Sequence, residues 1–403
     1  METDIQEDSN HQAYKIIKPE VIPFISYPYE WCFSQLKQAA LATLQIQKLA
    51  MNYGMTLKDS SAYNIQFREG KPILIDTLSF EKYQEGQPWV AYRQFCQHFL
   101  APLTLMSYTD IRLSQLFRIY IDGIPLDLAS KLLPPKTYLK FSLLSHIHIH
   151  ATTQKKYEDK AINISYRKLS RTGLLAIVDS LESAVNKLKW QPFGTEWGEY
   201  YDNNNYSLEA FADKKRLVKE FLEHVKPSSA WDFGANTGLF SRLAAERHIP
   251  TISFDIDPAA VEKNYLTTMK DGEVNILPLL LDLTNPSPGI GWKNKERSPL
   301  IQRGPTDMVF ALALIHHLAI SNNLPLSYIA EFFSKLCKFL VIEFVPKSDS
   351  QIQRLLATRE DIFTEYHQEA FERKFKKYFT IYKSTKILES ERTLYLMQRV
   401  IEV

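Results

Sequence analysis

Short apolar runs alternate with helical patterns over the second half of the sequence, and no other feature limits the possible folds as strongly. The runs are AWDF, TISFDID, VNILPLLLDL, DMVFALAL and FLVIEF. Such alternation is typical of a parallel sheet with helices on both faces. The final segments, YFTIYKSTKIL and RTLYLMQRVIEV, flank ESE and predict an antiparallel hairpin at the sheet edge. We therefore expect an α/β, doubly wound sheet of seven strands.

The first half of the chain is predicted to be mainly helical. The segment CFSQLKQAALATLQIQKLAMN has the apolar spacing of an amphipathic helix, and RTGLLAIVDSLESAVNKLK predicts another long helix. With 403 residues, the chain is longer than one ordinary domain. We expect a mainly helical accessory domain over residues 1–165, a connecting helix over 166–190 and the doubly wound domain over 191–403.

The composition is that of a globular protein without a strong overall charge. The formal net charge is only +2, so any attraction to nucleic acid or to an anionic membrane must be local. Cys32, Cys96 and Cys337 lie far apart without metal-ligand spacing, which indicates reduced thiols in a cytoplasmic protein. The acidic start METDIQEDSN does not resemble a secretory signal, and no apolar stretch is long enough for a membrane span.

The segment WDFGANTG, residues 231–238, contains Asp-Phe-Gly, which suggests two kinds of site. In a protein kinase this tripeptide binds magnesium and follows a catalytic loop, whereas here a helical pattern and VKPSSA precede it. The order is instead a strand, D-x-G-x-N-x-G and a helix, and Asp255 ends the next strand. This order predicts a Rossmann-like nucleoside site in which Asp255 accepts hydrogen bonds from both ribose hydroxyls.

The loop itself favours a cofactor without phosphates. Gly234 and Gly238 would let the backbone turn sharply and approach the ligand closely. The pattern is not G-x-G-x-x-G, and no basic residue in the loop could meet a pyrophosphate. Asp232 can face a ligand ammonium, and S-adenosylmethionine is the common nucleoside that carries one.

Residues from about 190 to 403 resemble a class I S-adenosylmethionine-dependent methyltransferase, because DFGANTG, FDID and LDL follow the first three strands in that family's order. The wider chain, with YPYEW, YRQFCQHFLAPL, ALIHHL and VIEFVPK, also resembles bacterial methyltransferases loosely related to nodulation proteins of rhizobia. The resemblance implies S-adenosylmethionine as cofactor. It implies that Gly234, Ala235 and Asn236 line the methionine part, Asp255 the ribose, and Asp282 with Leu283 the adenine. The expected cofactor-binding residues also include Asp232, Gly238 and Ile256. At position 236 the family more usually has glycine.

Two adjacent histidines are the candidate catalytic residues. Methyl transfer is an in-line displacement, so the protein mainly positions the acceptor and, where necessary, removes its proton. The segment ALALIHHL places His316 and His317 just beyond the fourth strand, at the edge of the sheet where ligands bind. Either histidine could be a base with a near-neutral pKa. Alternatively, one caps or packs the loop and the other faces solvent.

Two other features lie near this expected site, and each has two interpretations. Glu343, at the end of the fifth strand, could contact the substrate or pair with a basic neighbour. An aromatic run before the first strand could form a lid over the cofactor or pack at a domain interface. Its members are Trp197, Tyr200, Tyr201 and Tyr206.

Two segments suggest further ligands. In an extended strand, HIHIH at 146–150 would place three imidazoles on one face, but no carboxylate or cysteine accompanies it. We therefore expect the polar face of an amphipathic strand, and no metal. The stretch RKFKKYFTIYKSTK at 373–386 carries six positive residues and no acid. It could bind nucleic acid or a membrane surface, although a solvated helix face and strand edge are favoured.

A second pattern, LKDSSAYNIQFREGKPILID at 57–76, resembles the catalytic loop and metal strand of kinase-like phosphotransferases. The resemblance lies in Asp59, Asn64 and Asp76. However, Leu57 stands where His or Arg is usual, and no glycine-rich loop precedes the pattern. We expect a remnant of a kinase lower lobe that serves as a substrate or scaffold module, with active phosphotransfer as the alternative.

The sequence as a whole predicts methyl transfer to oxygen or nitrogen of a small molecule or glycoconjugate, with the accessory domain shaping the acceptor pocket. One alternative is RNA or protein methylation, which would need the stretch at 373–386 to flank that pocket. The other alternative is a non-catalytic scaffold that keeps the nucleoside site or the kinase-like module. The methyl acceptor and the oligomeric state are not predicted.

Overall fold

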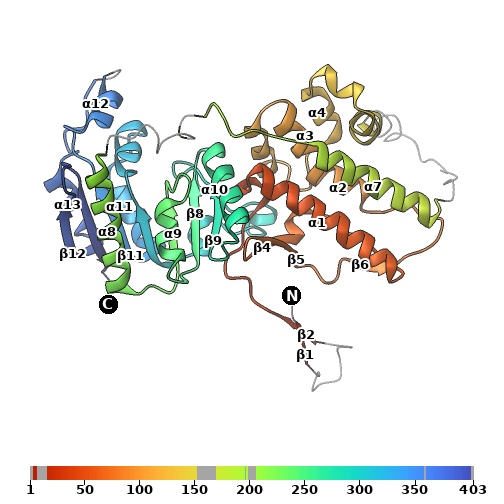
Figure 1. Cartoon of the computed structure of the whole chain (residues 1–403), viewed down its shortest axis with the longest axis horizontal. Helices are drawn as coiled ribbons and strands as arrows, with labels where there is room; N and C mark the ends of the chain where they lie inside the picture. Colours follow the sequence, from red (N-terminus) through yellow and green to blue (C-terminus); the bar gives the residue numbers. More distant parts are fainter. Residues whose placement is uncertain are drawn as a thin grey trace. The chain divides into compact units, whose positions relative to one another are not determined.

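The computed structural model divides into two compact units, Met1–Gln191 and Pro192–Val403 (Figure 1). Each unit has its own set of helices and strands, and each is described by itself. The described residues are 3–6, 16–151, 169–195, 197, 206–357 and 360–400.

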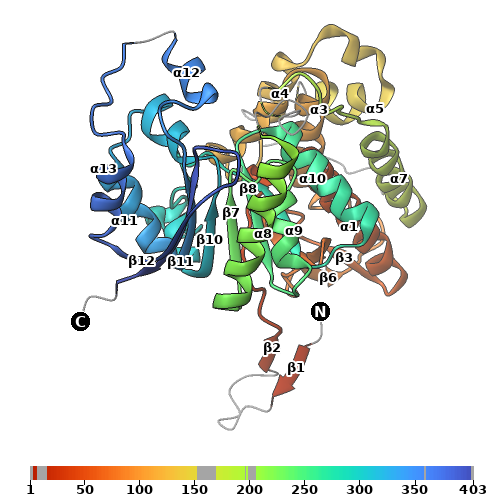
Figure 2. The same ribbon diagram turned by 60° about the vertical axis from the view of Figure 1, so that its left-hand side comes forward.

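A seven-stranded sheet forms the centre of the second unit, in the order β12-β13-β11-β10-β7-β8-β9 (Figure 2). All neighbouring strands pair in parallel except β13, which is antiparallel to both β11 and β12. The predicted fold class, a doubly wound sheet of seven strands with an antiparallel C-terminal hairpin, is therefore confirmed. The strands are β7 (Ala230–Phe233), β8 (Thr251–Asp255), β9 (Ile276–Leu280), β10 (Thr306–Ala311), β11 (Cys337–Phe344), β12 (Phe379–Lys386) and β13 (Thr393–Arg399).

Helices cover both faces of this sheet. Figure 2 shows α8, α9 and α10 on one face and α11 and α13 on the other. Asp257 begins α10 because its side chain accepts hydrogen bonds from the N–H groups of Ala259 and Ala260, so the chain turns directly from β8 into that helix. The helices are α8 (Leu208–Val225), α9 (Leu239–Ala245), α10 (Pro258–Asp271), α11 (Leu326–Leu336), α12 (Ser350–Leu356) and α13 (Gln368–Phe375), with short helical turns η8 (Trp292–Asn294), η9 (Leu300–Arg303) and η10 (His317–Ser321).

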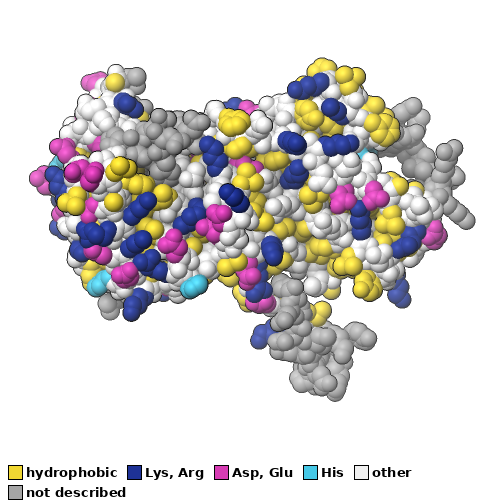
Figure 3. All heavy atoms as spheres, viewed as in Figure 1, with side chains coloured by type: hydrophobic (Ala, Val, Ile, Leu, Met, Phe, Trp, Pro, Cys, Tyr) yellow, Lys and Arg dark blue, Asp and Glu magenta, His cyan; other side chains and the backbone are white. Residues whose placement is uncertain are grey.

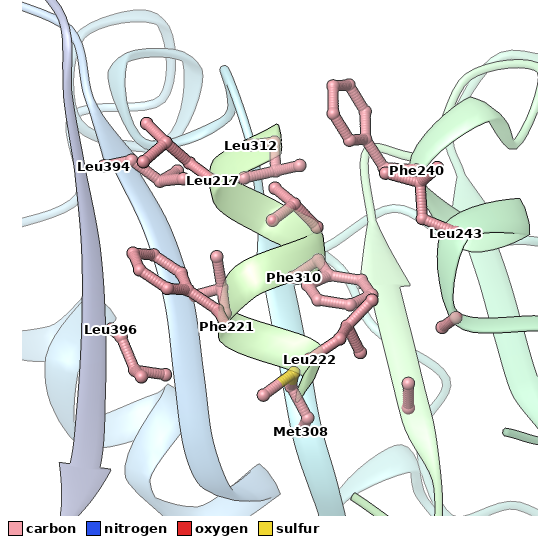
Figure 4. Close-up of a cluster of buried hydrophobic side chains, with 14 of the residues drawn as sticks. Leu217, Phe221, Leu222, Phe240, Leu243, Met308, Phe310, Leu312, Leu394 and Leu396 are labelled. Carbon is pink, nitrogen blue, oxygen red and sulfur yellow. The ribbon is translucent and has the colours of Figure 1, made fainter. Parts of the chain in front are cut away.

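A cluster of buried apolar side chains holds α8 against the sheet (Figure 4). Leu217 and Phe221, four residues apart, lie on the same face of α8 and are each 1% exposed. They belong to one cluster with Phe310 of β10 and with Leu394 and Leu396 of β13. Burial of these side chains fixes the central strand β10 beneath α8, so the loops at its carboxyl end have a firm base.

The first unit combines helices with short strand pairs. The two long predicted helices are present: α1 (Phe33–Asn52) and α7 (Arg171–Lys187), which Ser170 caps. The other helical segments are η1 (Pro28–Glu30), η2 (Ala62–Asn64), α2 (Tyr92–Phe95), η3 (Cys96–Leu100), α3 (Ala101–Tyr108), η4 (Ile111–Arg118), α4 (Leu126–Leu132), η5 (Pro135–Leu139), α5 (Phe141–Leu143) and η6 (Leu144–Ile149). The strands are β1 (Thr3–Gln6), β2 (Ile16–Pro19), β3 (Met55–Leu57), β4 (Ile65–Arg68), β5 (Lys71–Leu74) and β6 (Phe80–Lys82).

The histidine-rich segment 146–150 is helical, so its interpretation as an extended strand is wrong. In the helix, His146 and His148 are buried and bind different partners. The His146 Nε2 lies 2.9 Å from Ser180 Oγ, and the His148 Nε2 lies 2.9 Å from Thr137 Oγ1. Burial of these imidazoles inside the unit therefore favours the helix, although the alternating sequence predicted a strand.

Neither a membrane-spanning helix nor a metal-binding group of side chains is present in the described ranges. None of the helices there combines the length and the apolar character needed to cross a bilayer. Within the same ranges, no three His, Cys, Asp or Glu side chains are grouped so that they could hold a metal ion.

Candidate functional site

A cavity of about 280 Å³ opens at the carboxyl ends of β7, β8, β9 and β10. The strand order reverses between β7 and β10, which is where a doubly wound sheet forms its ligand crevice. Most of the residues predicted from the sequence line this cavity, whereas Gly238 and His316 do not contribute to its lining. The predicted residues that line it are Asp232, Gly234, Ala235, Asn236, Asp255, Ile256, Asp282, Leu283 and His317.

The turn after β7 requires glycine at two positions for different reasons. Gly234 and Gly238 have φ values of +72° and +79°, in the left-handed region that favours glycine. A Cβ atom on Gly238 would lie 2.5 Å from the Asn264 side chain, and one on Gly234 would lie 3.3 Å from Leu314 Cδ1. Because Gly238 has no side chain, the turn can pack against Asn264 of α10.

Asp255 connects the end of β8 to this turn. Its Oδ2 accepts a hydrogen bond from the Asn236 N–H at 2.7 Å, and its Oδ1 accepts one from the Asp257 N–H at 2.8 Å. The residue is only 7% exposed, and burial raises the pKa of Asp255 to about 6 although these N–H groups oppose the shift. The same carboxylate thus shapes the turn and lines the cavity.

A buried polar network that sequence reasoning missed supports Asp232. Ser241 Oγ donates to Asp232 Oδ2 at 2.7 Å and lies 3.0 Å from Ser253 Oγ, to which Asn264 Nδ2 donates at 2.8 Å. Burial raises the pKa of Asp232 to about 7, and the Asp255 charge adds to the shift. The signal in the sequence is small: two serines stand among apolar residues of α9 and β8.

Asn236, where the methyltransferase family more usually has glycine, holds a segment that lies before β7. Its φ is +51°, and its Nδ2 donates to the Trp197 carbonyl oxygen at 2.7 Å. The Trp197 N–H donates to Asp257 Oδ2 at 2.7 Å, and the indole packs edge-on against His317 with ring centroids 5.0 Å apart. The asparagine therefore has a structural role, which is to fasten Trp197 at the cavity wall.

The two candidate catalytic histidines occupy different environments. His317 lines the cavity, whereas His316 is 2% exposed, and within the described part of the chain its Nδ1 has no hydrogen-bond partner. Burial lowers the pKa of His317 to about 4, and the Arg392 charge adds to this shift. Burial likewise lowers the pKa of His316. The prediction of a near-neutral pKa is wrong for both rings because burial disfavours the charged imidazolium, and both are neutral at pH 7.

A buried ionic cluster forms a further part of the cavity wall. Lys214 Nζ lies 2.7 Å from Glu343 Oε2, and Arg392 Nη1 donates at 2.6 Å to the Tyr206 hydroxyl, which in turn donates to Glu343. Burial alone would raise the pKa of Glu343, but the charges of Lys214 and Arg392 lower it to about 2. Glu343 therefore pairs with basic neighbours, while Tyr206 and Lys214 line the cavity.

Part of this cluster could have been found from the sequence. Lys214 stands four residues after Ala210 and three before Leu217, so it interrupts the apolar face of α8. Its ion-pair partner Glu343 is 129 residues away, and no spacing rule connects the two. Tyr200 and Tyr201, the other members of the aromatic run, lie outside the described residues.

The kinase-like pattern of the first unit, residues 57–76, begins at the last residue of β3 and includes the antiparallel pair of β4 and β5. Asn64 Nδ2 lies 3.4 Å from Ser79 Oγ, which donates to Asp76 Oδ2 at 2.6 Å. Asp59 instead accepts a hydrogen bond from the Ser61 N–H at 2.9 Å. The structure thus brings Asn64 and Asp76 together around Ser79, while Asp59 closes its own turn.

The basic stretch 373–386 is largely paired with acidic side chains. Arg373 and Lys374 contact Glu365, Lys376 contacts Glu372, and Lys383 contacts Glu220. None of residues 373–386, all of which are described, lines the cavity. These contacts agree with a solvated helix face and strand edge.

The chain is similar to one curated protein over nearly its whole length. It is 36% identical over 405 residues to the nodulation protein NoeA of Rhizobium meliloti (strain 1021). The match covers 98% of this chain and 85% of that protein. No protein-family model matches the chain.

Solved structures resemble about half of the chain. Magnesium protoporphyrin IX methyltransferase from Synechocystis, solved with bound SAH, is 15% identical with a TM-score of 0.35, over 51% of this chain and 93% of that one. The N-methyltransferase NodS from Bradyrhizobium japonicum WM9 is 13% identical with a TM-score of 0.34, over 48% and 98%.

The buried Asp232 predicts an unusual dependence of stability on pH. Folded Asp232, with its pKa raised to about 7, binds a proton more tightly than the unfolded chain, in which aspartate titrates near pH 4. This group therefore lowers the free energy of unfolding as the pH rises from about 4 to 7. Asp232→Asn removes that loss. The free energy of unfolding of the variant, relative to wild type, should therefore rise by about 2–4 kcal/mol from pH 4.5 to pH 8, at about 1.4 kcal/mol per pKa unit.

Urea unfolding of both proteins at the two pH values measures this difference. The exposed Asp271→Asn serves as the matched control and should show no such gain. An equal difference between wild type and Asp232→Asn at both pH values would contradict the prediction.

Proposed function

The chain belongs to the family of the nodulation protein NoeA, and we propose that it is an S-adenosylmethionine-dependent methyltransferase whose second unit binds the cofactor. The proposed acceptor is oxygen or nitrogen of a small molecule or glycoconjugate. The observation that carries the proposal is the pair of buried carboxylates, Asp232 and Asp255, on either side of the glycine turn.

The residues present fit this cofactor better than a phosphate-bearing one. Ionised Asp232 and Asp255 are costly in their buried positions, as their raised pKa values indicate, and a cation or hydroxyl donors would offset that cost. The turn 234–238 contains no lysine or arginine that could meet a pyrophosphate. S-adenosylmethionine, when bound, supplies an ammonium, two ribose hydroxyls and an electrophilic methyl group on a sulfonium.

Each strand end would then contact a different part of the cofactor. The backbone of Gly234 to Asn236 approaches the amino acid part, and Asp255 accepts hydrogen bonds from the ribose. Ile256 is 56% exposed although it lines the cavity, and an adenine lying against it would cover this apolar side chain. Asp282 and Leu283 line the cavity beyond β9, where they would contact the rim of the adenine.

His317 lies at the proposed acceptor end of the cavity. Trp197 packs against its ring, and Asn236 fastens Trp197, so the imidazole has a defined position. Because burial holds His317 neutral at pH 7, it can accept a proton from an acceptor hydroxyl or amine as the bond to carbon forms. With a pKa of about 4, His317 is a weak base. Its contribution to turnover would therefore come more from positioning the acceptor than from removing a proton.

Two observations support a small acceptor over RNA or protein. Many of the residues that line the cavity are apolar, and the basic stretch 373–386 is absent from the lining. A large polyanionic acceptor would need unpaired cations near the cavity entrance. The apolar residues of the lining include Phe211, Phe240, Leu312, Leu318 and Leu355.

Replacement of Asp255 should weaken cofactor binding. Asp255→Asn leaves one acceptor oxygen, so we expect about tenfold to hundredfold weaker binding of S-adenosylmethionine and S-adenosylhomocysteine, the loss typical of a charged hydrogen bond. Calorimetric titration measures both affinities, and Asp271→Asn is the control because it carries the same change on an exposed helix end. Wild-type affinity in a folded Asp255→Asn protein would contradict the ribose assignment.

Replacement of His317 should separate turnover from binding. His317→Ala is expected to lower turnover about tenfold to a hundredfold while cofactor affinity stays near wild type, because the ring contributes to the reaction and not to the nucleoside site. His316→Ala, which changes a ring outside the cavity lining, is the neighbouring comparison.

The measurement uses methyl-labelled cofactor and cell extract, separated into small-molecule, glycoconjugate, RNA and protein fractions. Label in the small-molecule or glycoconjugate fraction is the expected result. Label confined to RNA or protein would contradict the proposed acceptor, and unchanged turnover in His317→Ala would remove this histidine from the reaction.

A further inference from the structure

The segment from Lys131 to Phe141 in the first unit exposes large apolar side chains to an unusual degree. Leu139 is 86% exposed and Phe141 is 82% exposed, while Tyr138 is 48% and Leu132 is 39% exposed. These residues follow one another closely along the end of α4, η5 and the start of α5. We call residues 131–141 the apolar-basic segment.

Lysines alternate with these apolar side chains. Lys131, Lys136 and Lys140 are exposed, and none of them forms a salt bridge with any carboxylate that the structure describes. Between Asp127 and Glu158 the sequence contains five lysines and no acidic residue. Figure 3 shows hydrophobic and Lys or Arg side chains side by side on the part of the surface around α4. The local charge is therefore strongly positive although the whole chain is nearly neutral.

The backbone that carries these side chains is held firmly. Thr137 is fully buried, and its hydroxyl lies 2.7 Å from the Pro134 carbonyl oxygen and 2.9 Å from His148 Nε2. The Tyr138 ring stacks on His148 with centroids 3.7 Å apart. Leu139 and Phe141 are thus presented outward by an ordered turn, so their exposure is a property of the folded unit.

We propose that the apolar-basic segment docks the protein on the surface of a bilayer that contains anionic lipids. Leu139 and Phe141 insert between the lipid headgroups, where burial of their apolar surface is favourable. The three lysines contact the lipid phosphates, and the half-exposed Tyr138 lies at the interface, as amphipathic aromatic side chains do.

The combination of exposed apolar side chains and lysines favours an anionic bilayer over other binding partners. Nucleic acid would satisfy the lysines but would leave the aliphatic Leu139 in water, whereas an anionic bilayer satisfies both kinds of side chain. A lipid surface needs no matching groove, which suits side chains that project from the unit at a turn. Docking of this kind needs no membrane-spanning helix.

Sedimentation with vesicles tests the proposal on the full-length protein. Wild type should bind phosphatidylcholine vesicles that contain phosphatidylserine, bind pure phosphatidylcholine at least about tenfold more weakly, and lose binding in high salt because lipid charge is screened. Leu139→Ser with Phe141→Ser, and separately Lys131→Glu with Lys136→Glu and Lys140→Glu, should each lower the partition coefficient about tenfold or more.

Matched controls keep the outcome interpretable. Tyr328→Ser with Ile362→Ser changes two side chains of the second unit that are 66% and 64% exposed, and this variant should bind vesicles like wild type. Thermal unfolding confirms that each variant is folded, and titration with S-adenosylhomocysteine monitors the second unit separately, so failure of this proposal is distinguishable from failure of the proposed function.

Three results would overturn the proposal. Wild type could fail to bind anionic vesicles, it could bind neutral vesicles equally well, or the segment variants could bind like wild type. Analytical ultracentrifugation adds a direct check on a competing occupant. A dimer that Leu139→Ser with Phe141→Ser dissociates, together with absent vesicle binding, would assign the segment to contact with a second copy of the chain.

Discussion

The cavity of the second unit depends on the buried carboxylate of Asp255, which joins the end of β8 to the turn after β7. One oxygen accepts the Asn236 N–H and the other accepts the Asp257 N–H, so the turn and the start of α10 share one anchor. The turn keeps left-handed backbone conformations at Gly234 and Asn236, which glycine and asparagine adopt most readily. The shape of the crevice therefore follows from contacts within the protein.

The buried carboxylates of this unit fall into two groups, which differ in whether cations or hydrogen-bond donors compensate their charge. Glu343 has Lys214 and Arg392 beside it, so it stays ionised within a salt-bridged cluster. Asp232 and Asp255 depend mainly on hydrogen-bond donors, and burial raises their pKa values. Neither carboxylate forms a salt bridge within the described part of the chain, although the Lys214 charge lowers the pKa of Asp232. A cationic ligand would therefore gain most beside them, which supports the proposed cofactor.

The strand ends and the glycine turn could be predicted from the sequence because their signals are local. The DFGANTG turn, FDID and LDL each follow an apolar run, and parallel strands bring such ends to one edge. The ion pair of Lys214 with Glu343 could not be predicted, because the two residues are 129 positions apart and pair only after folding. The helical state of 146–150 was missed because alternating His and Ile suggested a strand, whereas burial of His146 and His148 decided the conformation.

Calorimetric titration with S-adenosylhomocysteine in two buffers of different ionisation enthalpy tests the central claim most directly. This ligand keeps the ammonium and the ribose hydroxyls that should interact with Asp232 and Asp255, and both carboxylates must be ionised to hold it. The account predicts binding with proton release near pH 6, where both groups are partly protonated in the free protein, and without proton release at pH 8. Absence of binding heat at both pH values, or proton uptake on binding at pH 6, would contradict it.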